Sequence, residues 1–333
     1  IGTVEPSSLD SYREHGGYAA LERALEMGAD LVITEVTDAG LRGRGGAAFP
    51  TGVKWRGAAD ADSQTRYLIC NADESEPGTF KDRTIMEGDP FAVIEAMTIA
   101  GFAIGAKQGY LYIRGEYPDA AVALQAAIDQ ATEARLLGDD ILGEGVRFDI
   151  EIRQGQGAYI CGEETALFNS IEGFRGEPRQ KPPFPTEAGL FGQPTVVNNV
   201  ETLVNVLDIV LLGGEAFADV GTPDSTGTRL FCLSGAIDRP GVYEVEFGTT
   251  LGELLEFAGG PPEDLTAILL GGAAGSFVGP DMLDLPLTFE DSRAAGVSLG
   301  SGVVVVYDSS ADMKAVARRI ARFFRDESCG QCV

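Results

Sequence analysis

The alternation of strand-like and helix-like segments over residues 66–172 constrains the fold of this chain more than any other feature. Short apolar runs typical of strands alternate there with longer helical patterns, at 67–70, 90–104, 110–113, 118–136, 146–152 and 165–171. The strand at 146–152 is the clearest, because its apolar residues alternate with charged ones. Such alternation predicts an α/β domain with a mostly parallel sheet wrapped by helices.

Two polar loops follow strands of this predicted sheet. Residues 71–78 form an acidic loop after the first strand, and residues 154–164 form a glycine-rich loop after the third. Asn198 and Asn199 follow a further apolar run. Because ligands of parallel sheets bind beyond the carboxyl ends of the strands, these segments predict a binding site.

The segment 43–52 contains four glycines, which allow the backbone to approach a ligand closely and to adopt positive φ angles. Its N–H groups could converge on an anion, with Arg44 and Lys54 as charge partners and Phe49 as a stacking surface. The alternative is an ordinary turn-rich linker. The segment partly matches a dinucleotide fingerprint, but the residues before it fit a helical face, so we reject a standard Rossmann fingerprint.

The pattern of predicted strands and helices changes near residue 223. Strand patterns and one helical pattern follow within about 85 residues, at 229–233, 242–247, 251–258, 267–270 and 303–307. They predict a small ubiquitin-like β-grasp module, with a plain α+β spacer as the alternative. An amphipathic helix is expected over 311–325, directly before Cys329-x-x-Cys332. We therefore expect domains at 1–222, 223–309 and 310–333, the last being the truncated start of a helical domain.

Composition narrows the function. The net charge of −26 argues against nucleic-acid or anionic-membrane partners, and no apolar run approaches the roughly 20 residues of a membrane helix. We expect a cytoplasmic protein without direct membrane insertion. The chain begins with Ile1 and stops one residue after a Cys-x-x-Cys, so we expect it to be a piece of a longer polypeptide.

The cysteine and histidine content limits the possible metal and nucleophile chemistry. Five cysteines, an odd number, fit a reducing compartment better than a disulfide framework. Cys329 and Cys332 have spacing that suits zinc or an iron–sulfur cluster, with a redox dithiol or an incidental pair as alternatives. The other cysteines, Cys70, Cys161 and Cys232, are expected to be small buried hydrophobes. A single histidine argues against a histidine-based triad.

Carboxylates gather in the two loops that follow strands, at Asp73, Glu74, Glu76, Glu163 and Glu164. They could form a hard-metal site, accept hydrogen bonds from a polyhydroxyl ligand, or simply be solvated. Together with the asparagines, they provide the polar groups that a flavin nucleotide requires.

Motifs spread along nearly the whole chain resemble one family, the NADH-oxidising flavoprotein subunit of respiratory complex I and its relatives in NAD-linked hydrogenases and formate dehydrogenases. The motifs are GLRGRGGAAFPTGVKW (40–55), NADESEPGTFKDR (71–83), GAYICGEETAL (157–167), KPPFP (181–185), VNNVET (197–202) and SCGQC (328–332). Their order and spacing match those of the family.

The resemblance implies a Rossmann-like FMN and NADH domain and a role for each motif. FMN is expected to contact Gly43, Arg44, Gly45, Gly46, Lys54, Asn71, Asp73, Glu74, Tyr159, Gly162, Glu163, Asn198, Asn199 and Thr202. NADH is expected to contact Phe49, Glu76, Glu164, Lys181 and Phe184, with Glu164 adjusting the flavin potential. Cys329 and Cys332 would be two ligands of a [4Fe–4S] cluster whose other ligands lie outside this sequence. The expected partners are a thioredoxin-like [2Fe–2S] subunit and further electron-transfer subunits.

Two residues depart from the family pattern, and two other interpretations compete. Ala48 replaces the usual glycine in the loop against NADH, and Gly57 stands where some relatives have an aromatic near the adenine. The first rival is the flavin and iron–sulfur subunit of Rnf-type electron-transport complexes. The second is a ligand-binding scaffold that has lost its chemistry. The function that we expect is NADH oxidation through FMN, with single electrons passed to iron–sulfur clusters.

Overall fold

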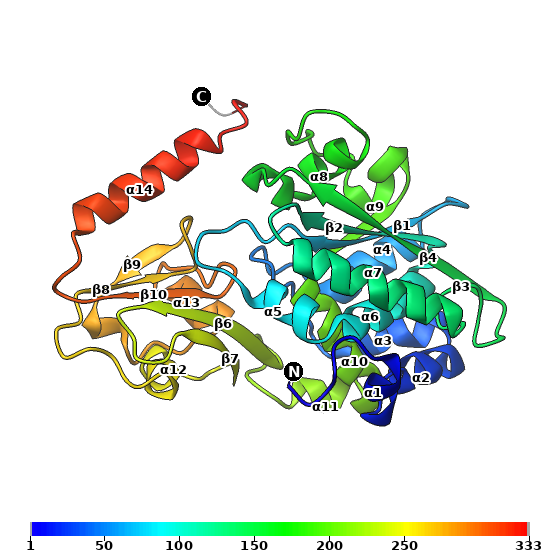
Figure 1. Cartoon of the computed structure of the whole chain (residues 1–333), viewed down its shortest axis with the longest axis horizontal. Coiled ribbons are helices and arrows are strands. Elements are labelled where there is room, and N and C mark those ends of the chain that lie inside the picture. Colours follow the sequence, from blue (N-terminus) through cyan, green and yellow to red (C-terminus); the bar gives the residue numbers. More distant parts are fainter. Residues whose placement is uncertain (1, 332–333) are drawn as a thin grey trace. The chain divides into compact units, whose positions relative to one another are not determined.

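The computed structural model describes residues 2–331 and divides into two compact units (Figure 1). The first unit contains the chain up to Gly43, then Phe49–Ser75 and Asp82–Phe217. The second contains Arg44–Ala48, Glu76–Lys81 and the chain from Ala218 onward. Among the described residues, none of the helices combines the length and the apolar character needed to cross a membrane.

The sheet of the first unit is parallel except at one edge, in the order β3-β4-β2-β1-β5. The parallel strands are β1 (Tyr67–Ala72), β2 (Gln108–Arg114), β4 (Val146–Gly155) and β5 (Thr195–Asn199). The mostly parallel sheet predicted from the sequence is therefore confirmed. The antiparallel edge strand β3 (Gly138–Ile141) was not predicted, because two exposed aspartates interrupt its apolar residues.

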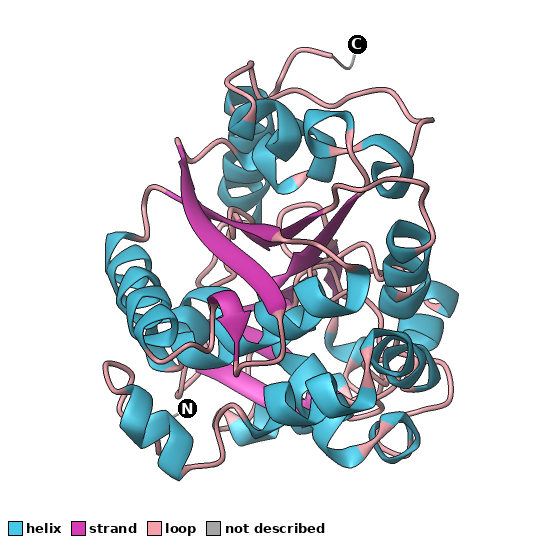
Figure 2. Ribbon diagram, turned by 90° about the vertical axis from the view of Figure 1, so that its right-hand side faces the viewer, coloured by secondary structure: helices cyan, strands magenta, loops and turns pink. Residues whose placement is uncertain are grey.

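Helices cover both faces of this sheet (Figure 2). On one side lie α6 (Pro90–Ile104), α7 (Pro118–Glu133) and α10 (Val200–Leu212), and on the other lie α8 (Glu164–Ile171) and α9 (Pro185–Ala188) (Figure 1). The remaining helices of this unit are α1 (Leu9–Glu14), α2 (Ala19–Met27), α3 (Ala29–Asp38), α4 (Thr51–Ala59), α5 (Lys81–Gly88), η1 (Tyr159–Gly162), η2 (Leu190–Gly192) and α11 (Gly214–Ala218).

Helix α6 is the central helix of the first unit and has the bounds that the sequence predicts. It begins where Asp89 accepts a hydrogen bond from the Ala92 backbone and Pro90 supplies a fixed φ, and it ends at Gly105 in a left-handed conformation. Nearly all its side chains are buried, and it packs on the sheet, α7 and α10. A helix that is apolar on all sides is stable only in such an interior.

One carboxylate interrupts this apolar helix. Glu95 is buried and accepts hydrogen bonds from the Tyr12 hydroxyl at 2.6 Å and from the backbone N–H groups of Tyr18 and Leu21 at 2.8 and 2.9 Å. Burial raises the pKa of Glu95, and these hydrogen bonds act in the opposite direction. The carboxylate therefore fixes the first turn of α2 on α6.

The second unit contains a mixed sheet in the order β7-β6-β10-β8-β9. Its strands are β6 (Thr228–Gly235), β7 (Gly241–Glu246), β8 (Ala267–Leu270), β9 (Ser276–Val278) and β10 (Val303–Tyr307). The last strand lies parallel to the first, between two antiparallel pairs, which is the β-grasp arrangement predicted from the sequence. Its helices are α12 (Leu251–Phe257), η3 (Pro280–Met282) and α13 (Phe289–Ala294).

Two short segments belong to the second unit although the first unit surrounds them in sequence. In the segment Arg44–Ala48, the Arg44 side chain is fully buried, donates to the Thr226 carbonyl at 2.8 Å, and lies 4.7 Å from the Phe247 ring centroid. In the segment Glu76–Lys81, Glu76 accepts from the Ala274 backbone at 3.1 Å. Both segments are thus held by side-chain contacts to the β-grasp module.

The final helix, α14 (Met313–Asp326), has the amphipathic pattern predicted for 311–325. None of its side chains is buried within the described part of the chain. The predicted domain boundaries after residues 222 and 309 stay predictions. The contiguous part of the second unit begins at Ala218 and includes α14.

Candidate functional site

The carboxyl ends of the parallel strands bring together the asparagines that the sequence singled out. Asn71 of β1 is directly opposite Asn199 of β5 in the sheet register, and Cys70 is opposite Asn198. The chain passes from β1 to β2 on one side, whereas β5 lies on the other side of β1. A sheet opens a crevice for ligands where the order of its strands reverses in this way, so the candidate site lies at the ends of β1 and β5.

The asparagine side chains connect neighbouring elements at this edge. The Asn71 amide accepts from the Asp73 backbone at 3.2 Å and donates to the Gly162 carbonyl at 2.9 Å, which joins β1 to η1. The buried Asn198 accepts from the Trp55 indole at 2.8 Å, which joins β5 to α4. These bonds hold the loops after the strands in fixed positions.

Lys54 carries a positive charge to the end of β5. Its ammonium donates to the Val197 carbonyl at 2.8 Å and lies 3.9 Å from the Glu164 carboxylate and 5.9 Å from the Phe49 ring centroid. Burial lowers the pKa of Lys54, and Glu164 only partly compensates. The lysine is therefore a cation that is partly withdrawn from water.

A second lysine bridges the two glutamates at the start of α8. The Lys181 ammonium lies 2.6 Å from Glu164 and 3.1 Å from Glu163. Burial alone would lower the pKa of Lys181, but the two carboxylates raise it above its usual value. Lys54, Glu164, Lys181 and Glu163 thus form one chain of alternating charges, all within the first unit.

Two of the predicted flavin contacts are also helix caps. Glu163 accepts from the Thr165 and Ala166 backbone at the start of α8, at 2.9 and 3.0 Å. Burial would raise its pKa, but these bonds and Lys181 bring the pKa below its ordinary value. Glu74 accepts from the Asp82 and Arg83 backbone at the start of α5, at 2.9 and 3.0 Å. Both carboxylates therefore accept hydrogen bonds from backbone N–H groups in the protein without a ligand.

Asn199 has a comparable double role. Its side chain accepts from the Glu201 backbone at 3.0 Å as the cap of α10, and it donates to Asp82 at 2.6 Å. Thr202 is buried in the first turn of that helix, and Tyr159 begins η1. Asp73 is buried in the loop after β1.

Phe49 and Phe184 are large aromatics that remain exposed, with 50% and 55% of their surfaces accessible. Phe174 and Phe191 of the same unit are exposed as well, so it is the 5.9 Å distance from the Phe49 ring to the Lys54 ammonium that connects an exposed ring with the charged site. Phe49 precedes α4 and Phe184 precedes α9, two helices that pack on each other.

The structure places Arg44 differently from the prediction. Its buried guanidinium contacts Thr226 and Phe247, so the side chain is committed to the β-grasp module and is not open to a ligand anion. An arginine among glycines is equally suited to binding an anion and to donating to carbonyls, so the sequence alone did not distinguish these two roles. Glu76 also belongs to that second unit, as do Gly45 and Gly46, whereas the Gly43 backbone donates to Phe49 at 3.0 Å.

Several contributing residues were missed. Trp55 holds Asn198, Thr165 donates to Glu163, and Arg114 donates to the Glu74 carbonyl. Trp55 is the only tryptophan of the chain and ends the 40–55 motif, which was an available signal. Thr165 directly follows the two glutamates of the 157–167 motif, which was also an available signal. Arg114 could not be recognised, because its partner Glu74 lies on a different element.

Metal chemistry finds no support among the described residues. No group of three or more histidine, cysteine, aspartate or glutamate side chains there is placed so that it could hold a metal ion. Cys70, Cys161 and Cys232 are buried, as predicted. Cys332 lies outside the described residues, so the cluster at Cys329 and Cys332 stays a prediction.

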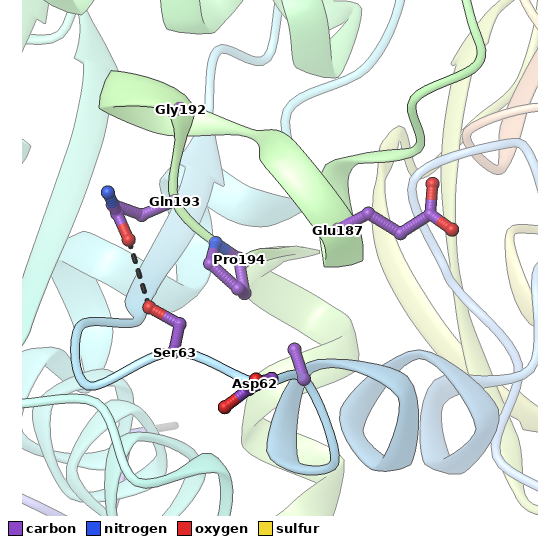
Figure 3. A pocket seen from close by; sticks show the side chains of 7 residues that line it. Asp62, Ser63, Glu187, Gly192, Gln193 and Pro194 are labelled. Atoms are coloured by element: carbon purple, nitrogen blue, oxygen red, sulfur yellow. Dashed lines mark hydrogen bonds between the residues drawn. The ribbon is translucent and has the colours of Figure 1, made fainter.

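A separate pocket of about 340 Å³ lies at the opposite end of the strands, next to the start of β5 (Figure 3). Its lining residues come from the segment after α4, from α9 and from the α9–β5 connection, namely Ala61, Asp62, Ser63, Glu187, Gly192, Gln193 and Pro194. Ser63 donates to Gln193 at 2.9 Å. Its lining contains two carboxylates and no cation, so it does not suit an anionic nucleotide.

The site at the ends of β1 and β5 does fit FMN. Its donor groups are the asparagine amides and a partly buried ammonium, which match a phosphate and the carbonyl and hydroxyl acceptors of a flavin nucleotide. Five hydroxyls among the described residues are buried without a hydrogen-bond partner, and two of them belong to Thr51 at the start of α4 and Ser75 after β1. Buried hydroxyls of this kind normally have a partner, and a polar ligand would supply one.

Comparison with known proteins agrees with this geometry. The family model described as the Nuo51 FMN-binding domain matches residues 36–208, just over half of the chain, and that of the SLBB domain matches residues 230–275. The second NADH-quinone oxidoreductase F subunit of Rhizobium meliloti is 48% identical over 97% of this chain and 78% of its own length. The corresponding F subunit of Escherichia coli is 47% identical over 98% and 75%, respectively.

Hydrogenase subunits are similar as well. The NADP-reducing hydrogenase subunit HndC of Solidesulfovibrio fructosivorans is 45% identical over 99% of this chain and 68% of its own length. The solved structure of an NAD⁺-reducing [NiFe]-hydrogenase in the H₂-reduced state superposes with a TM-score of 0.88 at 43% identity, over 95% of this chain. The chain spans about half the length of that solved chain. The chain therefore belongs to the family of FMN-binding flavoprotein subunits represented by the F subunits of NADH-quinone oxidoreductases.

Proposed function

We propose that this chain oxidises NADH with FMN as its cofactor and is the electron-input module of a larger complex. The observation that carries the proposal is the chain of alternating charges from Lys54 to Glu163, placed where the strand order of a parallel sheet reverses. FMN, when bound, accepts the hydride of NADH and passes its two electrons on one at a time. Family membership supports the same assignment.

Different residues of the first unit would bind FMN, stack on NADH and adjust the flavin potential. The amides of Asn71 and Asn198 and the ammonium of Lys54 would hold FMN, and the exposed rings of Phe49 and Phe184 would stack on NADH. Glu164 would place a negative charge near the flavin and so adjust its potential. Lys181 would neutralise part of that charge, since it lies 2.6 Å from Glu164.

The partners and location are also proposals. The relatives are named as subunits of quinone oxidoreductases and hydrogenases, which supports transfer of electrons to other subunits. A thioredoxin-like [2Fe–2S] subunit as the direct partner is an expectation from the sequence, as is a cytoplasmic location. Among the rivals, an Rnf-type subunit is not favoured by these relatives.

Purified protein reconstituted with FMN tests the function directly. We expect acid treatment to release FMN and not FAD, and anaerobic NADH to bleach the flavin absorbance. NADPH should be a poorer reductant, because the carboxylate of Glu76 would repel the 2′-phosphate. Retention of no flavin would overturn the proposal, and equal kcat/KM for the two nucleotides with ferricyanide would overturn the preference for NADH.

The lowered pKa of Lys54 predicts an unusual dependence of FMN affinity on pH. As the pH rises through this pKa, the ammonium loses its charge, so FMN affinity should fall at a pH below the ordinary lysine value of 10.5. Lys54→Arg should keep the charge and remove this alkaline limb. Fluorescence titration with FMN between pH 7 and 10 measures both, and an identical limb in the two proteins would contradict the prediction.

A further inference from the structure

The segment after α8 turns back along that helix toward its N-terminus. The Phe174 backbone donates to the Asn169 carbonyl at 2.8 Å, and the Asn169 side chain donates to the Glu177 carbonyl at 2.7 Å. One turn closer to the start of α8, the Arg179 backbone donates to the Thr165 hydroxyl at 2.8 Å. The segment therefore delivers Lys181 to the two glutamates at the start of the helix.

The Arg179 side chain joins this segment to two other elements. Its guanidinium donates to Asn169 at 2.9 Å and to Glu172 at 2.6 Å, both at the C-terminal end of α8. It also donates to the Gly189 carbonyl, which follows α9, at 3.3 Å. Glu172 in turn accepts from the Phe191 backbone at 2.7 Å. A single side chain thus spans the structures before and after the segment that carries Lys181 and Phe184.

The same hydrogen bonds continue into the charged chain of the site. The Thr165 hydroxyl, which accepts from the Arg179 backbone, donates to one oxygen of Glu163. The other oxygen of Glu163 accepts from Lys181 at 3.1 Å, and Lys181 donates to Glu164 at 2.6 Å. Arg179 lies only two residues before Lys181, so a shift of its backbone moves both ends of this network.

We propose that Arg179 is a positioning residue that sets the place of Lys181 and Phe184 in the nucleotide site. This inference rests on the proposed function, because the positions of Lys181 and Phe184 matter for activity only if these two residues contact NADH. The planar guanidinium makes three side-chain hydrogen bonds in diverging directions, which a lysine ammonium at the same position does not reproduce. With lysine there, the segment between Glu177 and Phe184 would keep its charge and lose its fixed course.

Two arginine-to-lysine substitutions distinguish a positioning role of Arg179 from the general effect of replacing an arginine in this segment. Arg179→Lys removes the hydrogen-bond geometry, and Arg175→Lys changes an exposed arginine of the same segment. The first readout is amide hydrogen exchange in the flavin-free full chain. We expect faster exchange for residues 173–184 in Arg179→Lys only, with unchanged protection of the buried helix α6.

The second readout uses the flavin-loaded protein. In Arg179→Lys, the Kd of ADP-ribose and the KM for NADH should rise roughly tenfold, while kcat changes by no more than about twofold. Arg175→Lys should match the wild type. Glu172→Gln should reproduce part of the effect, and combining it with Arg179→Lys should add little, because both changes break the same contact.

The outcomes are distinguishable. Unchanged exchange over 173–184 in Arg179→Lys overturns the positioning role whatever the protein binds. Faster exchange without any change in the ADP-ribose Kd overturns the link between the segment and the nucleotide. A wild-type protein that binds neither FMN nor ADP-ribose defeats the proposed function, while the exchange experiment still decides whether Arg179 orders the segment.

Discussion

Replacing Glu95 with alanine is expected to lower the free energy of unfolding by about 3–5 kcal/mol. The substitution leaves the Tyr12 hydroxyl and the backbone N–H groups of Tyr18 and Leu21 buried without their acceptor. It also leaves a cavity in the middle of α6, where neighbouring side chains are fully buried. The two losses act at the same place and both destabilise the native state.

Urea unfolding followed by circular dichroism measures this loss. Glu22→Ala, an exposed change on α2, is the matched control and should cost less than about 0.5 kcal/mol. Glu95→Gln should fall between the two, because the amide oxygen still accepts while the amide nitrogen faces donors. A loss below about 1 kcal/mol in Glu95→Ala would mean that Glu95 does not hold the N-terminal helices on α6.

The midpoint potential of the bound flavin is expected to move in opposite directions when the charges of Glu164 and Lys54 are removed. Glu164→Gln removes a negative charge, so reduction should become easier and the potential should rise. Lys54→Met removes the positive charge 3.9 Å from Glu164, so the potential should fall. Shifts on the order of tens of millivolts correspond to a unit charge in a partly desolvated site.

Anaerobic reductive titration at matched ionic strength measures both potentials, since the net charge of −26 makes surface fields depend on salt. Glu133→Gln removes the same charge from the exposed end of α7 and should leave the potential unchanged. Loss of FMN from Glu164→Gln would identify Glu164 as a structural ligand. Shifts of the same sign in both variants would exclude electrostatic control by this pair.

Much of the fold could be predicted from the sequence, because a regular spacing of apolar residues shows which side of a strand or helix is buried. The bounds predicted for α6, β8 and β10 match those observed. The short strands β9 and β3 were not predicted. β9 has only three residues, and β3 has aspartates in place of an apolar run. Local patterns carry too little information for such edge strands.

For the site, the sequence predicted which residues gather but not what each side chain does. Asn71 and Asn199 are adjacent in the sheet, as expected from two polar residues that end neighbouring parallel strands. The capping roles of Glu74 and Glu163 were missed, because a carboxylate before a helix looks the same whether it bonds a ligand or the backbone. The contact of Arg44 with Phe247 joins residues that are far apart in the sequence, which no local pattern encodes.

The position of Arg44 bears on how this protein can be recombined with its relatives. A hybrid that exchanges only residues 218–309 would leave Arg44 facing a foreign aromatic and a foreign carbonyl in place of Phe247 and Thr226. The segments 44–48 and 76–81 would have to be exchanged together with the β-grasp module. Evolutionary shuffling of this module is constrained in the same way, because a single crossover in the chain cannot transfer all three segments without the sequence between them.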